Sequence, residues 1–289
     1  MPVRRRLDWF SWLNGTAFVV LCLTMIAPIV HLAAVSLSSR FYAEAKLVTF
    51  WPRGFNIDVY KTILGMSNIW NSMGVSIFIT VFGTIIALAF TATMAYPLSR
   101  PQMNGRKWVL RGIIVTFVFS APLIPNYLLI RSLGMENTLW VLMIPGALNA
   151  FNVIIMKTFF QGISSEMFDA SKIDGCSELG SFARIAIPLS TPVIATIALF
   201  HAVGQWNSYF SALIYIRSKD LMPLQVLLRN LVVEEQANNV ANSAEVATML
   251  TPEMLKAGIT LFATAPILIV YPFLQKYFVK GAMVGSLKE

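Results

Sequence analysis

Residues 73–98 read MGVSIFITVFGTIIALAFTATMAYPL and contain no Asp, Glu, Lys or Arg. An α-helix rises about 1.5 Å per residue, so about 20 mostly apolar residues cross the hydrocarbon core of a bilayer. The segment Met73–Leu98 is long enough and apolar enough for that crossing. It therefore predicts a transmembrane helix.

Five other stretches have the same character. Several contain internal prolines, which neighbouring helices can accommodate by satisfying the freed backbone groups. The first stretch follows three arginines and could be an uncleaved signal sequence, but it is longer than a typical signal core and no small-x-small cleavage site closes it. We therefore expect an all-α integral membrane protein with about six transmembrane helices: Trp12–Leu37, Met73–Leu98, Trp108–Leu129, Leu139–Phe160, Pro192–Ile214 and Ile259–Phe278.

The composition supports lipid as part of the solvent. The chain is 56% hydrophobic and 12% charged, whereas a soluble domain carries about 25% charged residues. If the N-terminus lies inside, the six helices leave 13 basic and 6 acidic residues inside, against 9 and 8 outside. The inside segments then carry net +7 and the outside segments +1, as the positive-inside rule expects. The formal net charge of +8 thus reports topology and predicts no nucleic-acid partner.

The sequence offers no catalytic motif. It lacks the G-x-x-x-x-G-K-[ST] phosphate loop, H-E-x-x-H, C-x-x-C and G-x-S-x-G. His31 and His201 have no ligand partner nearby in sequence, and Cys22 and Cys176 fall in the membrane and in an inside loop. We therefore expect no catalytic residue, no metal site and no enzymatic activity in this chain.

We expect one membrane domain over residues 1–289, with outside loops at about 38–71 and 217–256. The inside loop at about 161–190 is unusually long, since a few residues suffice to turn a chain. Within it, residues 165–186 favour two short helices joined at Gly175. A structured hairpin of this kind is typical of a docking element.

The loop reads Asp169-Ala170-Ser171, three residues, Gly175, nine residues, then Ile185-Ala186-Ile187-Pro188. This resembles the signature of ABC importer permeases, which is Glu-Ala-Ala, three residues, Gly, nine residues, Ile-x-Leu-Pro. The spacing matches throughout, while Asp, Ser and Ile replace Glu, Ala and Leu.

The resemblance covers nearly the whole chain and points to permeases of sugar importers. It is closest to the smaller permease of maltose-type systems and to importers of alginate-like polysaccharides. The stretches that carry it are Phe55–Leu64 with Asn71-Ser72, Ala95-Tyr96-Pro97-Leu98-Ser99-Arg100, Leu133–Thr138, the residues from Ile173 to Pro192, and Gln205-Trp206-Asn207-Ser208-Tyr209-Phe210.

The resemblance implies the type I fold of ABC importer permeases and a set of partners. These are a second homologous permease, two cytoplasmic ATPases that bind ATP and Mg²⁺, an extracytoplasmic solute-binding protein and a saccharide. It implies no cofactor on this chain, and a multi-pass location in the cytoplasmic membrane of a bacterium, with both termini in the cytoplasm. The residues that would couple to the ATPases are Asp169, Ala170, Ser171, Asp174, Gly175, Ile185 and Pro188.

Polar and aromatic residues within the apolar stretches are candidates for a saccharide path, because amides bind sugar hydroxyls and aromatic rings stack on sugar faces. Each could instead fasten neighbouring helices, the use that we favour for each residue by itself and one worth about 0.6–2 kcal/mol per contact. The candidates are Asn149, Asn152, Gln205, Trp206, Asn207 and Tyr209.

Two alternatives to an ABC permease remain at this point. An ion-coupled secondary transporter should show ionisable residues at mid-membrane and internal repeats, and neither is evident. A non-transporting scaffold would leave the long inside hairpin without a role.

Overall fold

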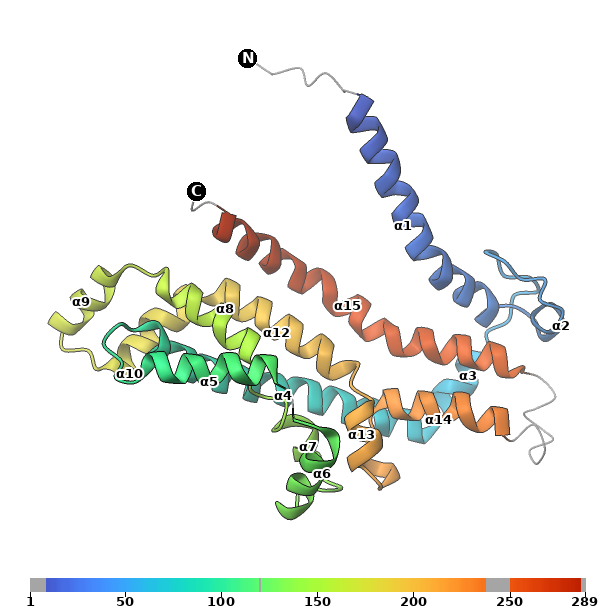
Figure 1. Cartoon of the computed structure of the whole chain (residues 1–289). Coiled ribbons are helices and arrows are strands. Elements are labelled where there is room, and N and C mark those ends of the chain that lie inside the picture. The colour runs from blue at the N-terminus through green and yellow to red at the C-terminus, as the bar shows by residue number, and fades with distance from the viewer. Residues whose placement is uncertain (1–8, 120, 238–249, 287–289) are drawn as a thin grey trace. The chain divides into compact units, whose positions relative to one another are not determined.

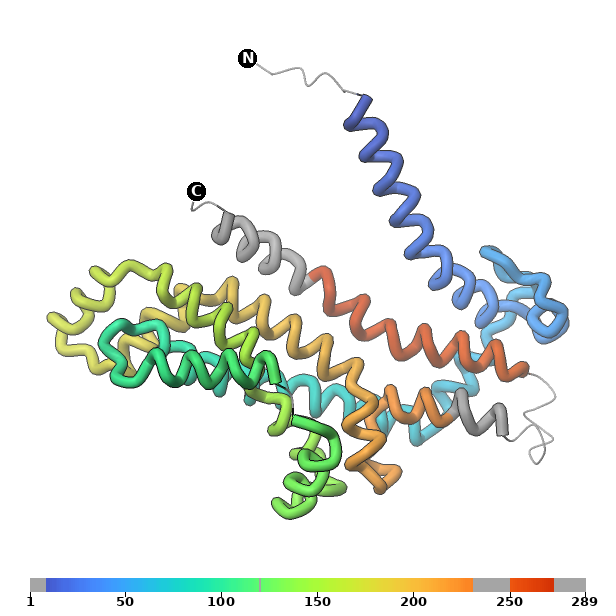
Figure 2. Tube along the Cα trace, viewed as in Figure 1, coloured from blue at the N-terminus to red at the C-terminus, as the bar shows by residue number. Residues whose placement is uncertain are grey.

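The computed structural model describes residues 9–119, 121–237 and 250–286, with side chains described up to residue 230 and from 250 to 272 (Figures 1 and 2). Within these residues the regular structure is helical throughout. A π-helical turn covers Phe182–Ala186 and a 3₁₀ turn covers Lys219–Leu221. The α-helices are α1 (Trp9–Ser36), α2 (Arg40–Glu44), α3 (Asp58–Gly65), α4 (Ser67–Ser99), α5 (Arg106–Val118), α6 (Leu123–Ser132), α7 (Trp140–Met143), α8 (Ala150–Gln161), α9 (Ser165–Ile173), α10 (Glu178–Ser181), α11 (Ile187–Leu189), α12 (Thr191–Trp206), α13 (Phe210–Tyr215), α14 (Leu224–Ala237) and α15 (Pro252–Ser286).

Three helical segments are each long and apolar enough to cross a membrane: α1, α4 and Pro252–Pro272 of α15. Two bent pairs reach the same length together, namely α5 with α6, and Glu178–Leu189 with α12. The described residues therefore hold three to five candidate spans by length and composition. The prediction of a helical membrane protein is confirmed, while the number six stays a prediction.

Two of the six expected spans are interrupted near prolines. In the stretch 108–129, α5 ends at Val118 and α6 begins after Pro122. In the stretch 139–160, the four-residue α7 and α8 are separated by residues 144–149, which contain Pro145 and Gly146. Proline provides no backbone N–H and clashes with the preceding turn, so it ends these helices.

The stretch 192–214 is also broken, without a proline at the break. Helix α12 ends at Trp206 and α13 begins at Phe210. The side-chain amide of Asn207 donates to the carbonyl of Val203 at 2.8 Å. The same carbonyl also accepts from the Asn207 backbone N–H at 3.1 Å, so Asn207 closes the last turn of α12 through both its main chain and its side chain.

The chain divides into two compact units, of which the first comprises residues 1–69 and 228–265. In this unit the segment after α1 folds back onto its end, because Asn56 N–H donates to the carbonyl of Leu37 at 2.9 Å. Val59 and Ile63 of α3 are fully buried in it. Gly258 of α15 lies so close to Val59 that a Cβ there would overlap it.

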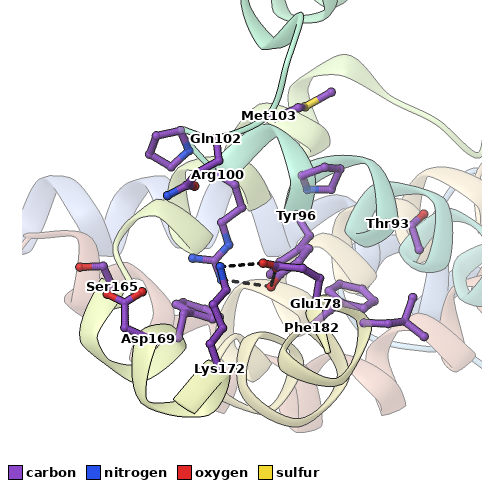
Figure 3. Close-up of a pocket in the computed structure, with 14 residues that line it drawn as sticks. Thr93, Tyr96, Arg100, Gln102, Met103, Ser165, Asp169, Lys172, Glu178 and Phe182 are labelled. Carbon is purple, nitrogen blue, oxygen red and sulfur yellow. Dashed lines mark hydrogen bonds and ion pairs between the residues drawn. The ribbon is translucent and has the colours of Figure 1, made fainter. Parts of the chain in front are cut away.

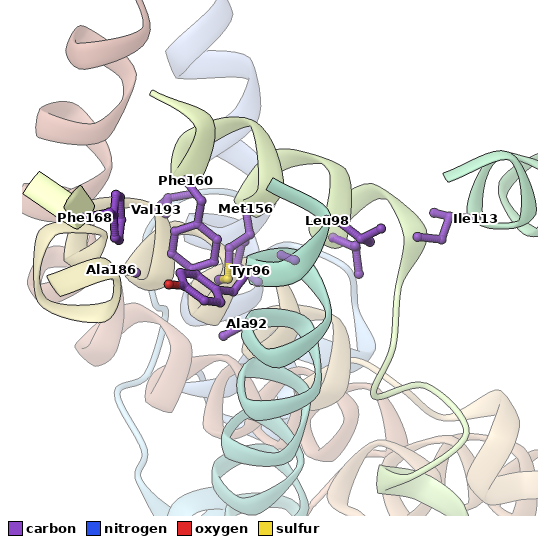
Figure 4. Packing of buried hydrophobic residues seen from close by; sticks show 12 residues of the cluster. Ala92, Tyr96, Leu98, Ile113, Met156, Phe160, Phe168, Ala186 and Val193 are labelled. Carbon is purple, nitrogen blue, oxygen red and sulfur yellow. The ribbon is translucent and has the colours of Figure 1, made fainter. Parts of the chain in front are cut away.

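The second unit comprises residues 70–227 and 266–289, and α4 carries two buried clusters in it. The far-end cluster gathers around Ile79 and includes residues of α6, α7 and α13. The hairpin-end cluster gathers around Tyr96, with Met156 and Phe160 of α8, Phe168 of α9 and Val193 of α12 (Figure 4). Ile79 and Tyr96 are about 25 Å apart along the helix axis, at 1.5 Å per residue. One helix thus connects the two clusters.

Candidate functional site

The loop 161–190 is a folded hairpin, with α9 and α10 on either side of Gly175. Gly175 adopts a left-handed conformation, with φ at 77°. Its N–H donates to the carbonyl of Lys172 at 3.0 Å, and Cys176 N–H donates to the carbonyl of Ser171 at 2.9 Å. This pair of bonds is the Schellman motif that ends a helix at a glycine. Gly175 therefore makes the turn, and open space surrounds the position where a Cβ would be.

Serine side chains fix the two hairpin helices at their starts and to each other. Ser164 caps α9 through Glu166 N–H, and Ser177 caps α10 through Gly180 N–H. The hydroxyls of Ser171 and Ser181 are 2.8 Å apart and buried, so they join α9 to α10. The expected coupling residue Ser171 thus holds the hairpin together from inside.

The other coupling candidates of α9 and its turn lie on the outer face. Asp169, Ala170, Asp174 and Gly175 are all exposed. The hairpin also exposes large apolar side chains: Ile173, which is 87% exposed, Leu179, which is 79% exposed and lines the edge of a cleft, and Met167, which is 45% exposed. We call Met167, Ile173 and Leu179 the apolar tip. Exposed apolar side chains that lie together are typical of a surface that binds a partner.

Ile185 and Pro188 lie where the hairpin returns to the membrane-spanning part. Ile185 belongs to the π-helical turn and packs partly buried against the hairpin-end cluster. Pro188 is exposed in the short helix α11, where its missing N–H costs little. These two residues connect the hairpin to α12 and do not belong to the outer face of α9 and its turn.

The base of the hairpin is held by the end of α4 (Figure 3). The guanidinium carbon of Arg100 lies 3.2 Å from the ring centroid of Phe168 and 4.8 Å from that of Tyr96. Phe168 is buried, and a cleft of about 580 Å³ opens beside this contact. The cleft is lined from the hairpin by Asp169 and Lys172, among others.

An ion pair closes the hairpin on the side of this cleft. Lys172 Nζ of α9 lies 2.8 Å from Glu178 Oε1 of α10, and the Tyr96 hydroxyl donates to Glu178 Oε2 at 3.3 Å. The hydrogen bond from Lys172 lowers the pKa of Glu178 below its usual value, and its positive charge adds to the effect, as does the bond from Tyr96. Glu178 thus has partners within the chain.

Two of the saccharide-path candidates are buried at the far end of α12. Gln205 Nε2 donates to the carbonyl of Leu142 at 2.7 Å, and its side chain lies against Gly83 of α4. The buried Trp206 forms part of an apolar groove of about 650 Å³ along α4, α12 and residues 266–271 of α15. Gln205 therefore fastens α12 to α7, and the surroundings of Trp206 suit an apolar occupant better than a sugar.

The other four candidates do not converge on one site. The side-chain oxygen of Asn149 caps α8 by accepting from Phe151 N–H at 2.9 Å, and Asn207 bonds to its own helix. Asn152 is buried in α8, while Tyr209 is about half exposed and packs edge-on against Phe210. Their role in a saccharide path stays a prediction.

The structure reveals functional candidates that the sequence did not single out. Tyr96, Arg100 and Phe168 form the contact between α4 and the hairpin. Their sequence signal is an arginine directly after a long apolar helix, in the stretch 95–100 that carries part of the family resemblance. No group of three or more His, Cys, Asp or Glu residues that could hold a metal occurs among the residues described.

No family model matches the sequence. Curated relatives cover nearly the whole chain. "Protein LplC" of Bacillus subtilis (strain 168) is 45% identical over 264 residues, covering 91% of this chain and 89% of the relative. The "Polygalacturonan/rhamnogalacturonan transport system permease protein YtcP" of the same strain is 40% identical over 272 residues, covering 94% of each chain.

A solved structure extends this likeness to three dimensions. A chain of a bacterial ABC transporter involved in the import of the acidic polysaccharide alginate superposes with a TM-score of 0.87 at 32% sequence identity. The match covers 96% of this chain and all of the other. The identities, the coverage and the shared fold agree with the helical membrane architecture and with the hairpin that carries the motif. The chain belongs to the family of permease proteins of ABC sugar-transport systems.

Proposed function

We propose that this chain is the membrane-spanning subunit of an ATP-driven importer, and that its hairpin is the coupling element. In this proposal it forms the translocation pathway with a second, homologous permease. Two ATPase subunits bind and hydrolyse ATP with Mg²⁺, and an extracytoplasmic binding protein delivers the substrate. This chain itself binds no cofactor and catalyses no reaction.

The observation that carries the proposal is the apolar tip on a rigid base. Ile173 and Leu179 are exposed at the end of a hairpin whose backbone is fixed by a Schellman turn, two serine caps and a buried serine pair. Exposing apolar side chains costs free energy unless a partner covers them. The partner that fits is a soluble ATPase subunit with a cleft that receives the apolar tip. The carboxylates of Asp169 and Asp174 beside the tip can pair with basic side chains of that cleft.

The proposed orientation puts the hairpin and both termini in the cytoplasm, with the protein in the cytoplasmic membrane of a bacterium. The excess of basic residues in the inside segments supports it, as do six spans threaded through the sequence. The bent pair α5–α6, the interrupted stretch 139–160 and the stretch 192–214 would each complete one crossing within the assembled transporter.

We propose oligo- or polysaccharides as the substrate. One relative is named as a polygalacturonan/rhamnogalacturonan transport permease, another as an arabinooligosaccharides transport permease, and the structural neighbour serves alginate import. A further structure, similar at 12% identity in fold only, is described in complex with an alginate pentasaccharide-bound periplasmic protein. That system supports an extracytoplasmic binding protein as a partner.

The test is reconstitution with a candidate second permease, an ATPase and a binding protein in liposomes. Ile173→Glu and Leu179→Glu place a charge on the apolar tip and leave the interior of the hairpin unchanged. We expect both variants to lose ATPase co-purification and binding-protein-stimulated ATP hydrolysis. The matched control is Leu133→Glu, because Leu133 is 62% exposed in the turn after α6, in another part of the same unit.

The proposal fails if the Ile173 and Leu179 variants retain the ATPase and its stimulation. It also fails if the parent chain takes up saccharide against its gradient without ATP or any ATPase, which is the behaviour of an ion-coupled secondary transporter. Uptake that depends on ATP and on the binding protein, and that is abolished by the tip variants alone, supports it.

A further inference from the structure

A coupling hairpin is useful only if its movement reaches the membrane-spanning helices. Within the second unit, the end of α4 contacts the hairpin through Tyr96 and Arg100. Tyr96 is buried in the last turn of α4, and Arg100 is the first residue after the helix. The two side chains meet, because Arg100 Nη2 lies 3.2 Å from the Tyr96 hydroxyl.

Tyr96 contacts three different elements at once. Its ring packs edge-on against Phe160 of α8, with centroids 6.0 Å apart, and in a tilted arrangement against Phe182 of the π-helical turn at 5.0 Å. Its ring is also 6.3 Å from that of Phe168 in α9. The ring therefore sits among the two arms of the hairpin and the helix that leads into it (Figure 4).

The hydroxyl of Tyr96 continues this contact with polar groups. It accepts a hydrogen bond from Arg100 Nη2 at 3.2 Å and donates one to Glu178 at 3.3 Å. Glu178 in turn pairs with Lys172, so an unbroken series of contacts runs from α4 to α10 and on to α9 (Figure 3).

Arg100 adds a second connection that does not pass through Glu178. Its guanidinium carbon lies over the ring of Phe168, a residue in the middle of α9. A planar guanidinium stacks on an aromatic face and donates hydrogen bonds in its plane at the same time, which an ammonium group cannot do. Arg100 can therefore hold Phe168 and the Tyr96 hydroxyl together.

We propose that Tyr96 and Arg100 are positioning residues that fix the hairpin to the end of α4, so that hairpin and helix move as one body. This inference rests on the proposed function, because it concerns how movement of the docked hairpin reaches the membrane. Without this connection the ATPases would still bind the tip, but the hairpin would shift against α4 and part of the stroke would be lost.

The matched variants are Arg100→Gln, Arg100→Lys and Tyr96→Phe, measured in the reconstituted complex. The control is Arg111→Gln, because Arg111 makes a similar cation–π contact with Trp108 on α5, away from the hairpin. Arg111→Gln removes the same positive charge as Arg100→Gln. Both residues also lie in the same unit.

Two readouts separate positioning from general stability. The first is amide hydrogen exchange over residues 165–181, which we expect to be roughly fivefold faster in Arg100→Gln, with unchanged exchange in the far-end cluster. The second is the saccharide taken up per ATP hydrolysed, which we expect to fall severalfold in Arg100→Gln while the ATPases still co-purify. Arg100→Lys should recover little of either, and Tyr96→Phe should show a smaller loss in both.

The proposal is overturned if hairpin exchange in Arg100→Gln equals that of the parent and of Arg111→Gln. It is also overturned if uptake and ATP hydrolysis fall together at a constant ratio, because that indicates loss of folded protein. If the parent complex shows no binding-protein-stimulated ATP hydrolysis, the proposed function fails by itself. The exchange experiment still decides whether Arg100 and Tyr96 hold the hairpin.

Discussion

Substitution of Gly175 separates two roles that this glycine can have, which are to allow the turn of the hairpin and to leave space for the proposed ATPase partner. Gly175 has φ at 77°, and an added Cβ would meet no atom within 4 Å in this chain. A non-glycine residue in the left-handed region costs about 1–2 kcal/mol, whereas Asn is tolerated there better than other residues. The expected cost in the free subunit is therefore conformational and unrelated to crowding.

We expect the hairpin to open about fivefold more often for each 1 kcal/mol by which a substitution lowers the stability of the hairpin. Gly175→Asn should raise it least, Gly175→Ala by about 1 kcal/mol and Gly175→Val more, because a β-branched side chain is disfavoured at positive φ. Amide exchange over residues 165–181 of the purified chain measures this order. Gly134→Ala is the control, since Gly134 has φ at 67° in open space but belongs to the turn after α6.

The same variants then report on the docked state through binding-protein-stimulated ATP hydrolysis. If docking only requires the turn, the rate of ATP hydrolysis should be highest with Gly at position 175 and fall in the order Asn, Ala, Val. The reasoning is refuted if Ala and Val exchange like Gly in the free chain. A second refutation is an Asn variant that abolishes hydrolysis as completely as Val, because space against the partner would then be the constraint.

Three further predictions concern separate contacts. Gly180→Ala should open the hairpin, because the new Cβ would lie 2.6 Å from Cys176 Sγ, and Cys176→Ala in the same chain should restore it; equal exchange in the single and double variants would contradict this. Asn137→Ala should lower the unfolding temperature in detergent by removing three hydrogen bonds to residues 217–218, a loss of about 1–2 kcal/mol, while Asn137→Asp keeps the acceptor and should lose less. The pKa of Glu178 is lowered, so its pairing with Lys172 stabilises the hairpin fully above the ordinary carboxyl pKa, and this stabilisation is lost as pH falls through the lowered pKa. Amide exchange of the hairpin, corrected for intrinsic rates, should therefore become faster at acid pH. Glu178→Gln should abolish this pH dependence.

The length of the apolar stretches predicted the long helices well, since α1, α4 and α15 fall on the expected stretches. It failed where a stretch was apolar throughout but not continuous. Pro122 and Pro145 were visible in the sequence, yet nothing local tells whether a proline bends a helix or ends it, because the neighbouring helices decide which backbone groups are satisfied. The break after Trp206 had no proline to announce it.

The hairpin was predictable because its signals are local. Gly175 and the small residues around it set the turn within a few residues, and the motif spacing identified the family. The contact of Arg100 with Phe168 joins residues 68 positions apart, so propensity and periodicity could not find it. The assignment of Asn149 and Gln205 to a saccharide path came from residue type alone, and their actual hydrogen bonds depend on which carbonyls and N–H groups the fold leaves open.

The π-helical turn Phe182–Ala186 gives the hairpin some tolerance in its number of residues. A π-helical turn accommodates one residue more than an α-turn, so deleting one residue there would restore ordinary winding and leave the helix that follows in nearly the same rotation. An added residue would instead rotate the helix that follows by about 100° and move Val193 and Ile197 off their buried face. The spacing between the hairpin and α12 therefore tolerates a deletion better than an insertion.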